Sequence, residues 1–145
     1  MRRAAFVFLL VSICSCGSVD VANLDPKEFS TTGGTTTGTD CTTVAASFAT
    51  DVVPIFSGRG CNASGCHTGA APAGNLDLTA SLGAPALFTN ATSNSRVSTS
   101  SPSDSKLLRK PLGLDSHGGG KVYDSITDAD YVTAYCWISA GAQSN

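Results

Sequence analysis

Cys61-Asn62-Ala63-Ser64-Gly65-Cys66-His67 is the stretch of sequence on which the interpretation of this chain depends. It contains two thiols, and an imidazole follows directly after the second thiol. These side chains bind metals and form covalent links to prosthetic groups. The small residues Ala63, Ser64 and Gly65 let the chain between the two cysteines loop outwards while Cys66 and His67 stay together.

The pattern is a lengthened form of C-x-x-C-H, in which two thiols bond to the vinyl groups of a haem and the adjacent histidine ligates the iron. Spacings longer than two residues are known among c-type cytochromes. The sequence therefore predicts one covalent haem c on Cys61 and Cys66, with His67 as an iron ligand. A Cys61–Cys66 disulfide and a metal-binding loop are the alternatives. A zinc site would need four protein ligands, and only His117 and the two remaining cysteines could add to the set.

The first residues are typical of an exported protein. Met1-Arg2-Arg3 is basic, and the apolar run of residues 4–11 that follows is too short to span a bilayer comfortably. Ile13-Cys14-Ser15-Cys16 resembles a bacterial lipobox, which predicts residues 1–15 as a lipoprotein signal peptide and Cys16 as the lipid anchor. A conventional signal peptide with a soluble product is the alternative. In either case we expect the domain in an oxidising compartment. The lipoprotein interpretation places it in the cell envelope, at the outer membrane or the periplasmic face.

The chain of 145 residues is long enough for one domain. Residues 16–40 include a low-complexity run of Thr and Gly, which predicts a flexible linker behind the lipid anchor, and residues 41–145 form the predicted domain. The formal net charge is −2 and no basic stripe is present, which argues against a nucleic-acid partner.

Three helices are predicted within the domain. The first covers residues 46–57, where Val44, Phe48, Val52 and Phe56 recur every fourth position; a start at an Asp51 cap is the alternative, because Pro54 is tolerated only in a first turn. A short helix covers residues 103–110 and ends at Pro111. The last covers residues 128–140, with Thr127 as its cap and Gly141 as its terminator. The remainder is predicted as loop.

Several segments, taken in chain order, match one known pattern. They are Val53-Pro54-Ile55-Phe56, the Cys61–His67 stretch, Gly74-Asn75-Leu76-Asp77-Leu78, Ser105-Lys106-Leu107-Leu108-Arg109-Lys110 and Trp137-Ile138-Ser139-Ala140-Gly141-Ala142. In this order the segments resemble the small cytochrome c domains of exported proteins and lipoproteins from myxobacteria, related deltaproteobacteria and planctomycetes. The resemblance covers nearly all of residues 41–142. It implies a mostly α, loop-rich, small cytochrome c-like fold, whose N- and C-terminal helices cross around one haem.

The resemblance also bears on the second axial ligand of the iron. The only methionine is Met1, which leaves with the signal peptide, so a methionine ligand is excluded. His117 begins a His-Gly-Gly-Gly run where some related domains carry their distal loop. We therefore expect ligation by His67 and His117. An exposed His117 and a five-coordinate iron form the alternative.

Cys41 and Cys136 remain, because Cys14 leaves with the predicted signal peptide, the lipid uses Cys16, and the haem uses Cys61 and Cys66. Because the helices near them are expected to cross, a Cys41–Cys136 disulfide is reasonable; two free buried thiols are the alternative. Trp137 is expected in the core. Lys106, Arg109 and Lys110 form a helix face that is more often solvated than bound to haem propionates.

These expectations together predict an electron carrier that serves redox partner proteins, and not an enzyme. Two other functions stay open. A displaceable His117 would allow a gas or a peroxide to bind, as in a haem sensor or a peroxidase-like protein. A haem-free surface module would instead have its cysteines in disulfides.

Overall fold

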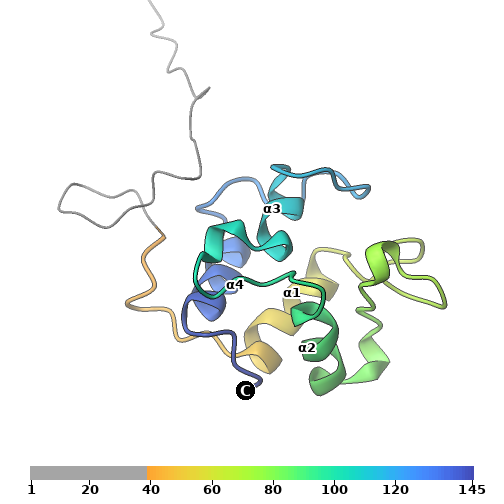
Figure 1. Ribbon diagram of the computed structural model, residues 1–145, viewed down its shortest axis with the longest axis horizontal. Helices are drawn as coiled ribbons and strands as arrows, with labels where there is room; N and C mark the ends of the chain where they lie inside the picture. The colour runs from red at the N-terminus through yellow and green to blue at the C-terminus, as the bar shows by residue number, and fades with distance from the viewer. Residues whose placement is uncertain (1–38) are drawn as a thin grey trace, which may run out of the picture.

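The computed structural model describes residues 39–145, which form helices joined by long loops (Figure 1). No β-strand occurs within this range, so the predicted mostly α class is confirmed. The predicted signal peptide, the lipid-anchor residue Cys16 and the linker up to residue 38 lie outside the described residues.

The elements follow one another along the chain as short helices. They are the π-helix η1 (Phe48–Val52), α1 (Val53–Gly58), the 3-10 turns η2 (Ala73–Asn75) and η3 (Ala80–Leu82), α2 (Ala84–Thr92), the 3-10 turn η4 (Pro102–Asp104), α3 (Lys106–Leu112) and α4 (Ala129–Ser139). The longest loops follow α1 and α3. These loops carry His67 and His117.

The first helical run begins close to its predicted start. The backbone N–H of Ser47 donates to the Asp51 carboxylate at 2.7 Å, so Asp51 lies inside the first turn and reaches back to its beginning. The alternative start at Asp51 is therefore wrong. Pro54 lies in the first turn of α1, directly after η1, where its missing N–H is tolerated.

Two predicted helix boundaries are wrong. Pro111 does not end the helix predicted for residues 103–110. It lies inside α3, in its last turn, where a missing N–H and a kink disturb no later turn. The cap of α4 is Asp128 instead of Thr127. Its carboxylate accepts a hydrogen bond from the backbone N–H of Asp130 at 3.0 Å.

Helix α2 lies in a region that the sequence analysis predicted as loop. It starts after Gly83, whose φ of 75° breaks the preceding turn, and Pro85 occupies its first turn. Leu87 and Ala91 lie four residues apart and are buried against the core. This spacing after an early proline was the signal that could have predicted the helix.

The core joins the first and last helices. Phe48 of η1 lies 5.1 Å from Trp137 of α4 and 5.3 Å from Phe88 of α2, measured between ring centroids. Trp137 is 1% exposed, which confirms its predicted place in the core, and its indole N–H donates to the Gln143 carbonyl. The three helices therefore share one aromatic cluster beneath the loops.

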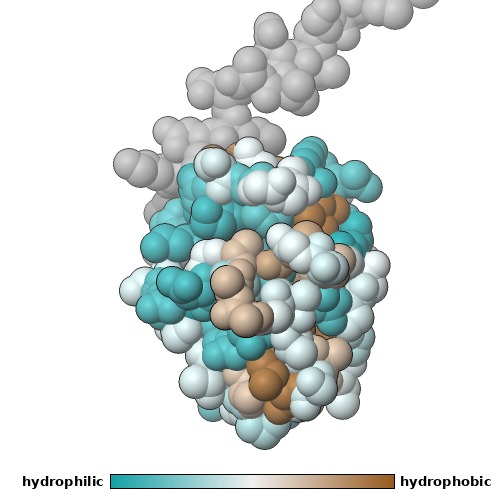
Figure 2. All heavy atoms as spheres, turned by 90° about the vertical axis from the view of Figure 1, so that its right-hand side faces the viewer, coloured by the Kyte–Doolittle hydropathy of each residue, from teal (hydrophilic) through white to brown (hydrophobic). Residues whose placement is uncertain are grey.

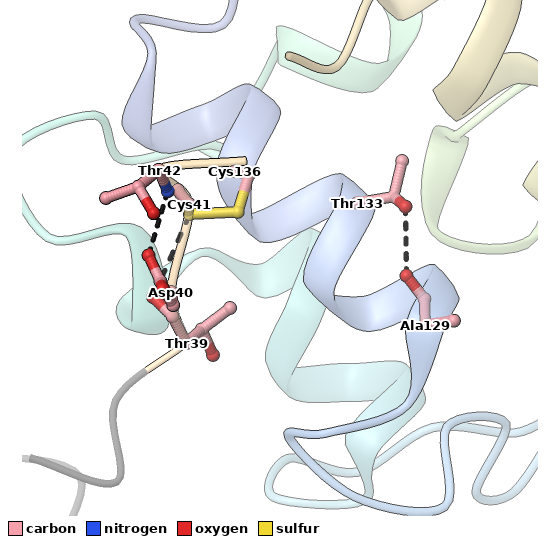
Figure 3. Close-up of a disulfide and its surroundings, with 7 residues drawn as sticks. All are labelled: Thr39, Asp40, Cys41, Thr42, Ala129, Thr133 and Cys136. Carbon is pink, nitrogen blue, oxygen red and sulfur yellow. Dashed lines mark hydrogen bonds between the residues drawn. A yellow bond between two sulfur atoms is a disulfide. The ribbon is translucent and has the colours of Figure 1, made fainter. Parts of the chain in front are cut away.

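A disulfide links the start of the described chain to the last helix. Cys41 is bonded to Cys136, which lies on the buried side of α4 (Figure 3). This is the pairing expected from the sequence, and two free thiols at these positions are not found. Because the bond spans 95 positions of sequence, it holds the segment before η1 against α4.

Candidate functional site

The Cys61–His67 turn begins where α1 ends. The Cys61 N–H donates to the Phe56 carbonyl at 2.8 Å, and the His67 N–H donates to the Cys61 carbonyl at 3.0 Å. The residues between the two cysteines therefore loop out, and the chain returns to Cys61 at His67. Gly65 has a φ of 82° at the tip of this loop, a conformation that favours glycine.

Both cysteines of the turn are free thiols and half-buried. Cys61 packs against the hydrophobic core, and burial raises the pKa of its thiol above the usual value. At neutral pH the Cys61 side chain is therefore a thiol and not a thiolate. A thiol of this kind can add to a carbon–carbon double bond or pair with a second thiol.

Hydrogen bonds hold the backbone N–H, the backbone carbonyl and the ring of His67. Its carbonyl accepts from the Leu78 N–H at 2.7 Å, and its Nδ1 lies 2.9 Å from the Ala73 carbonyl. Because a carbonyl only accepts, Nδ1 carries the proton and donates. Burial lowers the pKa of His67, and the nearby His117 adds to this effect. The ring is therefore neutral near pH 7, with the lone pair on Nε2.

His117 lies in the loop after α3, and ion pairs fix the approach to it. Arg109 donates to Asp115 through Nε and Nη2, both at 3.0 Å, and Lys110 Nζ donates to the Ser116 carbonyl at 2.8 Å. His117 Nδ1 donates to the Gly120 carbonyl at 2.7 Å, and the Gly120 N–H donates back to the His117 carbonyl at 2.9 Å. Within residues 39–145, no hydrogen bond to Nε2 of His117 is found.

The two imidazoles lie close together and nearly parallel. Their ring planes are 9° from parallel and their centroids are 6.0 Å apart. Two metal–nitrogen bonds of about 2 Å, with about 1 Å from each nitrogen to its ring centre, add up to about the same distance. The separation thus fits two imidazoles on opposite sides of one metal ion. The hollow beside His117 is open, about 690 Å³ in volume, and includes Leu112, Leu114 and Lys121 in its wall.

The donor set is too small for a metal bound by the protein alone. Within residues 39–145, no three side chains of His, Cys, Asp or Glu come together as a metal site. A tetrahedral zinc site needs four such ligands, so the zinc alternative lacks its ligand set in this part of the chain. Two imidazoles suit a metal that brings its equatorial ligands with it, and two free thiols suit a covalent link.

Arg59 ties the cysteine turn to the beginning of α4. Its guanidinium lies 2.6 Å from carboxylate oxygens of both Asp128 and Asp130, and it lies over the Tyr123 ring. Burial raises the pKa of Asp128, but the backbone N–H groups of Asp124 and Asp130 and the charge of Arg59 lower it by more. Asp128 is therefore ionised at neutral pH, and α4 is anchored beside Cys61.

Arg96 belongs to the site, and the sequence analysis missed it. Its side chain is buried, with no carboxylate among its hydrogen-bond partners; Nη2 donates to the carbonyls of Gly74 and Asn75, at 2.8 and 2.9 Å. These carbonyls follow Ala73, which accepts from His67. The signal in the sequence was an arginine in a stretch, residues 78–103, that contains no acidic residue.

The predicted site residues thus divide into three groups. Cys61, Cys66, His67 and His117 lie in the two loops whose histidines face each other, and Cys41 and Cys136 form a disulfide elsewhere. Arg109 is engaged by Asp115, while Lys106 and Lys110 are exposed. Cys16 lies outside the described residues.

No family model, curated protein or solved structure matches this chain. Between residues 39 and 145, no helix is long and apolar enough to cross a membrane.

Proposed function

We propose that this chain is a monohaem c-type cytochrome that carries electrons outside the cytoplasm. The observation that supports this most strongly is the parallel pair His67 and His117, each with Nδ1 bound to a backbone carbonyl. Metal-binding histidines commonly have this arrangement, because the bond at the other nitrogen fixes the tautomer and the ring orientation.

In this proposal each cysteine has a defined task. The S–H bonds of Cys61 and Cys66 would add across the two vinyl groups of a haem, so that each sulfur would bond to carbon and each hydrogen would go to the neighbouring carbon. No atom is lost, and the haem stays attached when the protein unfolds. When bound, the haem supplies a one-electron redox centre.

His67 and His117 would hold the iron of the bound haem, and with both in place no position would be left for a substrate. The N–H donated by His67 to Ala73, and by His117 to Gly120, makes each imidazole a stronger ligand and holds its plane. A histidine pair gives a lower reduction potential than a histidine–methionine pair, because thioether ligation raises the potential. The protein therefore acts as an electron carrier and not as an enzyme.

Export and lipid attachment are part of the same proposal. The basic start, the short apolar run and the lipobox-like residues before Cys16 support a lipid anchor on that residue, with the domain in the cell envelope. Its partners would be redox proteins of the same compartment. Incorporation of labelled palmitate into the wild-type chain, and its loss in Cys16→Ala, tests this part.

The deciding experiment combines mass and spectrum. Residues 17–145 are exported behind a cleavable signal peptide in cells that also express the cytochrome c maturation proteins. The intact mass under denaturing conditions should exceed that of the chain by one haem, and reduction should sharpen the visible bands. A colourless protein of apo mass would refute the proposal and favour the disulfide-linked surface module.

A sensor function is the second candidate. His117 is partly exposed and lies in a glycine-rich loop beside an open hollow, so its displacement by a small ligand would require little rearrangement. Carbon monoxide binding to the reduced wild-type protein would favour this function over electron transfer.

A further inference from the structure

Exposed positive charge gathers near His117. Lys106, Lys110 and Lys121 are exposed, and none has a carboxylate within salt-bridge distance in residues 39–145. Of the arginines in the same range, Arg59 and Arg109 form ion pairs and Arg96 is buried. The free cations therefore come from α3 and the loop that follows it.

The three lysines belong to one continuous face. Lys106 and Lys110 are four residues apart on α3 and so lie on the same side of the helix. Lys110 Nζ donates a hydrogen bond to the backbone carbonyl of Ser116. Ser116, His117 and Lys121 line the same hollow. Asp115 also lines this hollow, but it is paired with Arg109, so the three lysines leave the face positive. We call the face formed by Lys106, Lys110, Leu114 and Lys121 the basic face.

Leu114 gives this face an apolar point. It is 50% exposed, more than the other exposed large hydrophobic residues between 39 and 145, and it lies in the wall of the hollow with Lys121. By contrast, the side of the molecule that carries the loops between α1 and α2 has hydrophobic residues in small separate patches among hydrophilic ones (Figure 2). An apolar centre surrounded by a polar, solvent-accessible rim is the usual composition of a protein interface.

We propose that the basic face is the docking surface for an acidic redox partner protein. This inference rests on the proposed function, because it places the partner next to the axial ligand His117. The charge of the face opposes that of the whole chain, which has a net charge of −2. An acidic partner would therefore be attracted at this face and repelled elsewhere, which orients the encounter.

The first test uses small redox reagents of opposite charge. One electron passes from the reduced protein to ferricyanide, which becomes ferrocyanide, and the rate is followed at low ionic strength. Lys110→Gln/Lys121→Gln should slow this reaction by about three- to tenfold and should speed the reaction with hexaammineruthenium(III). Salt should remove both effects, because the charges are exposed.

A matched control lowers the net charge by the same amount elsewhere. Thr43→Glu/Ala45→Glu changes two exposed residues of the segment before η1, which contributes no residue to the hollow beside His117. The control should leave both rates within about twofold of the wild type. Equal effects of the two double variants would mean that only net charge matters, and would overturn the proposal.

The second test does not need the haem. Poly-L-glutamate is added to the isotope-labelled haem-free chain, and its amide signals should shift mainly in residues 106–121 and less in the double lysine variant. In a parallel measurement, vesicles containing phosphatidylglycerol replace the polyglutamate and test binding to an anionic membrane. Vesicle binding that depends on the lysines, without polyglutamate binding, would assign the face to an anionic membrane and overturn the proposal. A chain that takes up no haem but binds polyglutamate at this face would refute only the proposed function.

Discussion

The imidazole of His117 lies parallel to that of His67, within 9° and 6.0 Å between centroids. The distance suits an offset stack as well as two ligands on one metal ion. Both Nδ1 atoms lie within hydrogen-bond distance of backbone carbonyls of their own loops. Metal-binding imidazoles commonly have such a bond at the nitrogen that does not bind the metal.

Replacing His117 should open one axial position. In haem-loaded His117→Ala, we expect a high-spin ferric spectrum and carbon monoxide binding by the reduced protein, whereas the wild type should bind none. His117→Met should instead raise the reduction potential, because a thioether favours the reduced iron. Ser116→Ala is the control, since only its backbone carbonyl is used. An unchanged low-spin spectrum in His117→Ala would remove His117 from the ligand set.

The helices could be predicted from hydrophobic spacing, but their ends depended on contacts that spacing does not encode. Phe48, Val52 and Phe56 recur at a helical period and are buried. The cap at Asp128 was missed because two neighbouring residues, Thr127 and Asp128, are both good caps. Helix α2, with 9 residues, is longer than α1 and α3, and it was missed because Gly83 and Pro85 at its start are also typical of loops.

The candidate site was predictable where one local motif contains its residues, and less so where distant loops meet. Cys61, Cys66 and His67 are neighbours in sequence, and His117 was found because so few other donors exist. Arg96 has no motif, since its partners are the Ser93 hydroxyl and the backbone carbonyls of Gly74, Asn75, Asn90 and Ser93. Backbone acceptors have no side-chain signature, so the lack of nearby acidic residues was the only signal for this contact.

Removing the disulfide should destabilise the domain strongly. A bond that closes a loop of 95 positions limits the unfolded chain, and its loss should cost about 2–5 kcal/mol. We expect Cys41→Ala/Cys136→Ala to lower the denaturant midpoint, as measured by circular dichroism. Addition of a reductant should lower the midpoint of the wild type and leave that of the variant unchanged. Equal midpoints for the two proteins without reductant would contradict this role.

Arg96 should be needed to hold the loop after His67. Arg96→Met keeps much of the buried volume but leaves the carbonyls of Gly74 and Asn75 without their donors, which should cost about 2–4 kcal/mol. Hydrogen exchange of the Leu78 amide, which donates to His67, should quicken. The reduction potential of the haem-loaded variant should shift, because the Ala73 carbonyl loses its support.

Arg96→Lys supplies a second measurement for the same residue. Lysine keeps the charge but lacks the planar guanidinium, whose N–H groups reach the carbonyls of both Gly74 and Asn75. It should therefore rescue little of the lost stability. Arg109→Lys is the matched control at a partly exposed ion pair, where the loss should be small. A wild-type potential in Arg96→Met, measured in folded protein, would show that Arg96 does not position His67.

Acid should weaken the anchor of α4. The pKa of Asp128 is lowered in the folded state, so its contribution to the free energy of unfolding is present above the unfolded value of about 3.9 and is lost as the pH falls through the lower folded value. Asp128→Asn should be less stable than the wild type at pH 7, by an amount on the order of 1 kcal/mol. The two proteins should converge near pH 2, and a difference that stays constant with pH would exclude the carboxylate as its source.

Gly120 should be required for its backbone conformation, unlike its neighbour Gly118. Gly120 has a φ of 73°, and its carbonyl accepts from His117 Nδ1, whereas Gly118 has no such φ; neither glycine has another atom within 4 Å of an added Cβ. Gly120→Ala should therefore cost about 1 kcal/mol through strain alone, and Gly118→Ala should cost less. Because the strain falls on the partner of His117, haem-loaded Gly120→Ala should bind carbon monoxide more readily than Gly118→Ala. Equal carbon monoxide binding in the two variants would mean that the Gly120 carbonyl does not hold His117 in place.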